Sequence, residues 1–225
     1  MACMVARIRD FVGLLPILMN SAEAKSLNEH WLRGSGVTVN PALPKSEEPA
    51  VLTPRSAEKV ATRAWVLSYV LGVGLGRSAD EVLDQLRAVE LLDFLTPRER
   101  NVLRKPKFTH SDRAWAACLT EAVHGCAWAM GLVETGPLEK CPPTLTSHFP
   151  HGSDPFPSIR AARLRNFDDI YLRADLNYRL HWAARQARFD GSPFPFPEAY
   201  IQARRHAIDW IVGIPHDWDD MPLDT

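Results

Sequence analysis

The sequence lacks an excess of charge of either sign, because 26 basic residues stand against 27 acidic ones. A chain so close to neutral exerts no overall field on nucleic acid or on an anionic membrane. It also lacks a second apolar run that approaches the roughly 20 residues of a membrane-spanning helix. We therefore expect neither a membrane partner nor a nucleic-acid partner. The alternative is a basic patch formed by Arg160, Arg163, Arg165, Arg204 and Arg205.

The chain is also poor in cysteine and has no Cys-x-x-Cys pair. Its four cysteines are scattered: Cys3, Cys118, Cys126 and Cys141. This spacing predicts free thiols in a reducing compartment, without a zinc or redox site. His148 and His151, with Asp154 nearby, are of the right type to bind a metal, but their spacing matches no metal signature. We expect these two histidines to face solvent on a loop, and no metal or cofactor to be bound.

The N-terminus imitates a secretory signal peptide through two arginines, an apolar run and small residues: Arg7, Arg9, Phe11–Met19 and Ala22–Ala24. The imitation is imperfect because Asp10 interrupts the entry to the run and Pro16 lies within it. We therefore expect a cytoplasmic protein. Residues 1–26 are interpreted as an N-terminal helical extension, and residues 27–225 as a single domain of ordinary size.

Strand alternation is almost absent, with Val37–Val39 as the one short extended candidate. Helix signals are frequent instead, and most consist of a hydroxyl side chain followed by proline or glutamate. Such signals and helical periodicity place helices at about 53–71, 78–90, from 96, 111–130, 168–189 and 198–212, with helical pattern returning from Ile159. The prolines of residues 132–157 indicate a stretch without regular structure. The expected fold is all-α: a single multi-helix domain with long proline-rich connecting loops.

Charged residues on the last two expected helices are the main candidates for chemistry. Asp175 and Arg179 are spaced i to i+4, which predicts an intrahelical ion pair, and His181 follows half a turn later. Such a pair is commonly structural. The sharper interpretation is a polar pocket in which His181 acts as acid or base and arginines hold an anionic group.

Arg204 and Arg205 on the last helix are consecutive, so their side chains point in different directions. We expect one of them to face solvent and the other to turn inward toward a carboxylate, and Arg205 to pair with Asp209. If the chain is an enzyme, its candidate catalytic residues are Asp175, Arg179, His181, Arg204 and Arg205.

The acidic C-terminal segment contains Trp218, which is costly to leave exposed. We expect its ring to dock against the body and to hold Asp219 and Asp220 near arginines. These three residues are the candidate binding residues.

Several blocks of sequence occur in an order that resembles a known family: Asn28-Glu29-His30-Trp31-Leu32, Arg55 to Ala64, Trp115 to Gly131, Asp175-Leu176-Asn177-Tyr178-Arg179-Leu180-His181-Trp182-Ala183, Arg204-Arg205-His206-Ala207, Trp218-Asp219-Asp220 and Asp224-Thr225. Over roughly residues 27–225 they are similar to the bacterial family catalogued as domain of unknown function 4272 (DUF4272). The resemblance implies a cytoplasmic protein and no particular activity. The chain departs from the family at Ala203, where a glutamate is expected, and at Asp209, where asparagine is usual.

Three hypotheses for function follow. The first is a non-catalytic binding protein whose partner is another protein, such as an immunity protein that neutralises a bacterial toxin by covering its active site. The second is an enzyme, a hydrolase or a nucleotide-processing activity, with its Asp/Arg/His pocket on the two late helices. The third is a structural scaffold, in which the same polar residues only satisfy one another. Small size and the lack of a catalytic signature favour the first.

Overall fold

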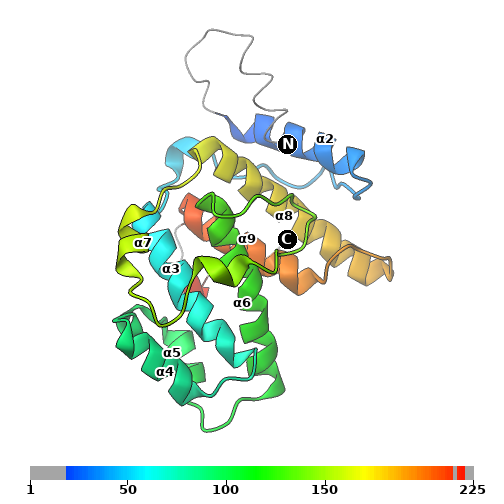
Figure 1. Cartoon of the computed structure of the whole chain (residues 1–225). Coiled ribbons are helices and arrows are strands. Elements are labelled where there is room, and N and C mark those ends of the chain that lie inside the picture. The colour runs from blue at the N-terminus through cyan, green and yellow to red at the C-terminus, as the bar shows by residue number, and fades with distance from the viewer. Residues whose placement is uncertain (1–18, 215–216, 221–225) are drawn as a thin grey trace.

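The computed structural model describes residues 19–214 and 217–220 (Figure 1). Its α-helices are α2 (Ser21–Gly34), α3 (Ala57–Val70), α4 (Ala79–Ala88), α5 (Pro97–Leu103), α6 (His110–Ala129), α7 (Phe156–Ala161), α8 (Phe167–Asp190) and α9 (Glu198–Val212). Short 3-10 helices lie at Pro49–Val51, Leu71–Val73, Leu92–Phe94, Leu145–His148 and Trp218–Asp220. The described residues contain no strand, so the all-α class is confirmed.

The helices pack as a stack in which each contacts the next. The order is α2, α8, α9, α6 and α3, with α4 and α7 against α3 (Figure 1). Most of the hydrophobic core lies among α3, α6 and α9, and a smaller apolar cluster joins α2 to α8. Because α9 lies between α6 and α8, and α8 lies between α9 and α2, both helices bury more than one face. Polar residues on these helices therefore need partners inside the protein.

Helix starts follow the capping signals closely. Ser78 accepts a hydrogen bond from the Glu81 amide while the Glu81 carboxylate accepts one from the Ser78 amide, which confirms the expected capping box of α4. Thr96 and Glu99 form the same arrangement at α5. Each box satisfies amide groups that a helix start would otherwise leave without acceptors.

The expected start of helix α3 at residues 53–54 is wrong. Helix α3 begins at Ala57, and the Ser56 side chain caps it by accepting from the Lys59 amide at 3.3 Å. The preceding segment is held extended by the end of α9, where the Arg55 amide donates to the Ile211 carbonyl at 3.0 Å. A long-range contact thus overrides the local signal.

Part of the region expected to be irregular is helical. Leu145–His148 forms a 3-10 helix, and α7 begins at Phe156, earlier than expected. Pro157 lies in the first turn of α7, where a missing amide proton costs no helical hydrogen bond. The extended candidate Val37–Val39 forms no strand.

Residues 1–18, with most of the signal-like sequence, lie outside the described residues, as do 221–225. Helix α2 runs through the expected domain boundary at residues 26–27. None of the described helices combines the length and the apolar character that crossing a bilayer would take.

Candidate functional site

The Asp175–Arg179 pair on α8 is buried under α2. The Asp175 carboxylate accepts from Nε and Nη2 of Arg179 at 2.9 and 2.8 Å. It also accepts from Asn28 of α2 at 2.9 Å and from the Ser46 hydroxyl at 2.8 Å. Glu29 of α2 lies 3.5 Å from Arg179 Nη1. The carboxylate of Asp175 therefore has four donors, and the pair ties α8 to the N-terminal part of the domain.

A second network joins α8 to α9. Arg205 pairs with Asp209 at 3.0 Å, as expected, and its Nη1 lies 3.0 Å from Nδ1 of His181. Because an arginine can only donate, His181 must accept at Nδ1 and is neutral. Burial and the adjacent guanidinium of Arg205 lower the pKa of His181 to about 4. Burial raises the pKa of Asp209 to about 6, although Arg205 opposes this shift.

Arg204 belongs to a third network, on the opposite side of α9. It forms an ion pair with Glu121 of α6 and donates to the carbonyl groups of Pro137 and Glu139 at 3.1 and 2.7 Å. The expectation that one of Arg204 and Arg205 faces solvent is wrong, since both are buried. The reason is that α9 is covered by α6 on one side and by α8 on the other.

The five catalytic candidates therefore lie in three neighbouring networks, two of which meet at the Tyr178 ring. Arg205 and Asp209 reach a small cavity of about 180 Å³, which Tyr171 and Tyr178 also line. His181 is 2% exposed and does not line this cavity. The ion pairs and hydrogen bonds of these side chains join α2, α6, α8 and α9 to one another.

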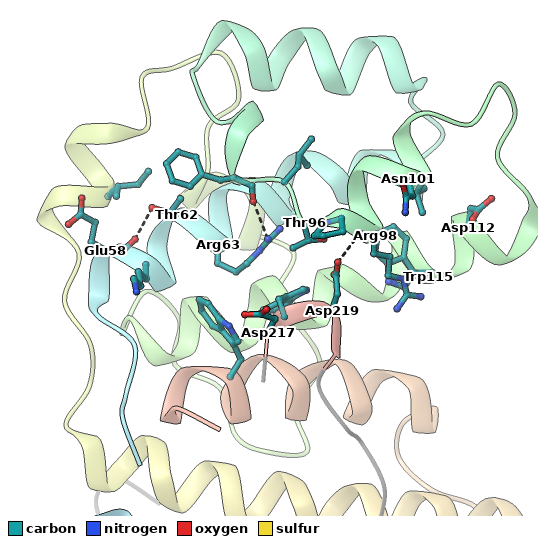
Figure 2. A pocket seen from close by; sticks show the side chains of 18 of the residues that line it. Glu58, Thr62, Arg63, Thr96, Arg98, Asn101, Asp112, Trp115, Asp217 and Asp219 are labelled. Carbon is teal, nitrogen blue, oxygen red and sulfur yellow. Dashed lines mark hydrogen bonds between the residues drawn. The ribbon is translucent and has the colours of Figure 1, made fainter. Parts of the chain in front are cut away.

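A much larger concavity lies elsewhere, between α3, α5, α6 and the C-terminal turn. It has a volume of about 1230 Å³ and is walled by Trp115, Trp210 and Trp218, with Arg63 and Arg98 among its cations. We call it the tryptophan groove. Figure 2 shows residues of α3 on one side, residues of α5 and α6 on the other, and the acidic residues of the C-terminal turn between them.

Charges of both signs line the tryptophan groove. Lys105 and Asp112 neutralise each other at 2.6 Å. The guanidinium carbon of Arg98 lies 4.9 Å from the centre of the Trp115 ring, so this cation stacks on an aromatic face (Figure 2). Such a cation–π contact keeps the arginine extended along the wall.

Trp218 docks in the groove as expected and is only 7% exposed. Its ring stacks on His206 at 4.4 Å, meets the edge of Trp210 at 5.3 Å and lies beneath Arg63 at 5.1 Å. Nε2 of His206 lies 2.7 Å from the Trp218 carbonyl and donates to it. Burial lowers the pKa of His206 to about 4, with Arg63 among the groups that oppose its protonation, so the ring is neutral near pH 7.

The acidic residue after Trp218 is held by backbone rather than by a guanidinium group. Asp219 Oδ2 accepts from the Arg98 amide at 2.7 Å (Figure 2). This places Asp219 beside an arginine, as expected, through a different atom of that arginine. The side chain of Asp220 lies outside the described residues.

His151 does not simply face solvent on its loop, contrary to expectation. Its Nε2 lies 3.1 Å from the Ser68 hydroxyl, and its ring stacks on Tyr69 at 3.9 Å. The Ser68 hydroxyl donates to the Trp65 carbonyl at 2.7 Å, so its proton is already engaged within α3. These contacts attach the loop to α3. Among the described residues, no three His, Cys, Asp or Glu side chains gather closely enough to hold a metal ion.

The tryptophan groove was not predicted from the sequence as a site, apart from its C-terminal residues. Its walls come from segments that are far apart in the chain and carry no shared motif. The tryptophans themselves are the one sequence signal for the groove. Trp115 and Trp210 lie on helices whose other faces form the core.

Comparison with known proteins places the chain in a family without a described activity. No curated protein and no solved structure matches it. The family described as "Domain of unknown function (DUF4272)" matches residues 24–221, from within α2 to just beyond the C-terminal turn. All three late-helix networks and the tryptophan groove lie inside this match. The chain therefore belongs to the DUF4272 family.

Proposed function

We propose that this chain is a non-catalytic binding protein that receives a segment of another protein in the tryptophan groove. The observation that carries this proposal is an open concavity of about 1230 Å³ whose walls combine three tryptophans with arginines. Ligand pockets for small molecules usually measure about 300–1,000 Å³. The tryptophan groove is larger, as a polypeptide segment would need.

The composition of the groove supports a protein partner. Tryptophan and arginine are the residues most enriched among those that dominate binding energy at protein interfaces. Trp115 and Arg98 stand together on one wall, and Lys59 stands on another with no carboxylate partner resolved. The catalytic candidates Asp175, Arg179, His181, Arg204 and Arg205 are buried in networks outside the groove. Binding therefore accounts for the groove without assigning chemistry to it.

We propose a toxin as the partner class, with the chain acting in the cytoplasm as an immunity protein that covers the toxin's active site. Small size and a groove suited to a protruding loop support this finer proposal. The free thiols Cys118, Cys126 and Cys141 agree with a reducing compartment. Growth of cells that express a toxin encoded beside this chain should be rescued by co-expression of the chain.

The direct test is capture of the partner from cells of the source organism by tagged wild-type and variant chains. The double variant Lys59→Glu/Arg98→Glu reverses two groove cations and should lose at least tenfold in affinity for the captured partner. Arg87→Glu on α4 is a matched control, since Arg87 is exposed, lies outside the groove and has only a surface pair with Asp84. Equal capture by both variants would refute the groove as the binding surface.

A further inference from the structure

The C-terminal turn lies between two cavities rather than at the edge of one. Trp115, Trp218 and Asp219 line the tryptophan groove and also a second cavity of about 460 Å³. The second cavity runs along α6 and α9, and the small side chains of Ala122 and Ala203 are among those that line it. Because the turn supplies part of the lining of both cavities, its departure would enlarge both.

The contacts of the turn are those that a bound peptide makes. One main-chain carbonyl, that of Trp218, accepts from His206 at 2.7 Å, and one side chain, that of Asp219, accepts from the Arg98 amide at 2.7 Å. The indole ring fills an aromatic seat between His206 and Trp210. A single buried tryptophan anchored by two hydrogen bonds is also how a short peptide is held at a hot spot.

We propose that Trp218 and Asp219 are an internal ligand of the tryptophan groove, and that the partner carries an aromatic residue followed by an acidic one that takes their place. This inference rests on the proposed function and specifies the partner's chemistry. The partner is thus a protein segment with an exposed aromatic–acidic pair.

The seat selects the acidic residue by charge and by hydrogen bonding. At the position of Asp219 an incoming side chain meets the amide of Arg98, which can only donate. Arg98 also lines the groove, whereas the guanidinium group of Arg63 is already paired with Glu99. A carboxylate satisfies the amide and is attracted by the Arg98 cation. A lysine or arginine at the same position would be repelled and would leave the amide without an acceptor.

The internal ligand also sets a threshold for the external one. A segment joined to its seat by a short tether acts at an effective concentration of roughly millimolar. An external segment therefore displaces the chain's own turn only if its affinity for the seat overcomes this effective concentration. Weak, unrelated segments are excluded from the seat of Trp218 in this way.

The test measures whether the seat accepts the sequence of the turn when it is supplied from outside. A fluorescein-labelled peptide with the sequence of residues 214–222 is titrated with the full-length chain, and binding is followed by fluorescence polarisation. The full-length variant Trp218→Ala has an empty seat and should bind this peptide at least tenfold more tightly than the wild-type chain. Trp218→Phe retains an aromatic ring in the seat and should bind with intermediate affinity. It serves as the second variant if Trp218→Ala does not fold.

Two altered peptides make the test specific. A peptide with Trp218→Ala should show no binding to the emptied seat, and one with Asp219→Asn should bind several-fold more weakly. The inference is overturned if the native peptide binds the emptied chain no better than wild type, or if the altered peptides bind equally well. Loss of partner capture in Lys59→Glu/Arg98→Glu would still uphold the proposed function in that case, so the two failures are distinguishable.

Discussion

Arg205 on α9 donates to Nδ1 of His181 on α8 over 3.0 Å, so an arginine holds a buried histidine in its neutral form. The contact joins two helices at the centre of the stack. A proton on Nδ1 would remove the acceptor and place two cations in contact. The pH dependence of stability is the measurable consequence.

The first prediction concerns this histidine. Its pKa in the folded protein is about 4, against about 6.5 in an unfolded chain. The unfolded state therefore takes up the proton first as the pH falls. Titration of His181 does not change the free energy of unfolding above about pH 6.5. As the pH falls from there to about 4, it lowers the free energy of unfolding by no more than about 1.4 kcal/mol per pH unit.

The variant His181→Asn isolates this effect. The asparagine amide oxygen can replace Nδ1 as an acceptor for Arg205, but it does not titrate. Denaturant unfolding at pH 7, 6, 5 and 4 should show a smaller loss of stability in the variant than in the wild type. The variant must be compared with the wild type because Asp209 acts in the opposite direction in both proteins. Its pKa is raised to about 6, so its protonation increases the free energy of unfolding as the pH falls below 6. Parallel curves would show that His181 does not titrate in this window.

The second prediction concerns the buried pair on α8. Arg179→Ala leaves the carboxylates of Asp175 and Glu29 without their buried cation and should lower the free energy of unfolding by about 3–5 kcal/mol. Arg33→Ala removes another arginine from Glu29, but at the surface, and should cost about 1 kcal/mol or less. Chemical denaturation of both variants checks the contrast, and similar losses would contradict a structural role for Arg179.

The third prediction concerns two glycines with nearly the same φ angle. Gly76 and Gly213 have φ angles of +97° and +99°, so alanine is strained at both. A Cβ at Gly76 meets nothing within 4 Å, whereas at Gly213 it would lie 2.1 Å from the Thr53 carbonyl oxygen. Gly213→Ala should therefore lower the melting temperature much more than Gly76→Ala, by the equivalent of at least about 2 kcal/mol. Equal shifts would mean that the segment at Thr53 moves away freely.

The fourth prediction concerns thiol reactivity. Cys126 is fully buried, and burial raises its pKa to about 12. Because the thiolate is the reactive form, iodoacetamide at pH 8 should leave Cys126 unmodified in the folded protein and modify it in guanidinium chloride. Mass spectrometry of tryptic peptides reads both states. Rapid modification of Cys126 in native buffer would show that the core around α6 opens readily.

The sequence predicted those features that depend on residues close together in the chain. The capping box of Ser78 and Glu81 and the ion pairs Asp175–Arg179 and Arg205–Asp209 are all set by spacings of three or four residues. A helix makes these contacts whatever surrounds it.

The features that the sequence did not reveal depend on how the helices pack. Glu121 as the partner of Arg204, and Asn28 and Ser46 as donors to Asp175, lie more than 80 positions away from the residues that they bind. No spacing rule connects them. The Thr53 signal failed for the same reason, because the end of α9 determines the conformation of that segment. The tryptophan groove is likewise produced by packing alone.

The central position of α9 has a consequence for biosynthesis. This helix follows all the other α-helices in chain order, yet it separates α6 from α8 in the stack. Proteins emerge from the ribosome N-terminus first, at roughly 5–20 residues per second. The apolar surfaces that α6 and α8 present to α9 stay uncovered until residues 198–212 have been translated, so the core cannot be completed before that segment has left the ribosome. Nascent chains that stall before α9 should therefore be the form of this protein that most needs a chaperone.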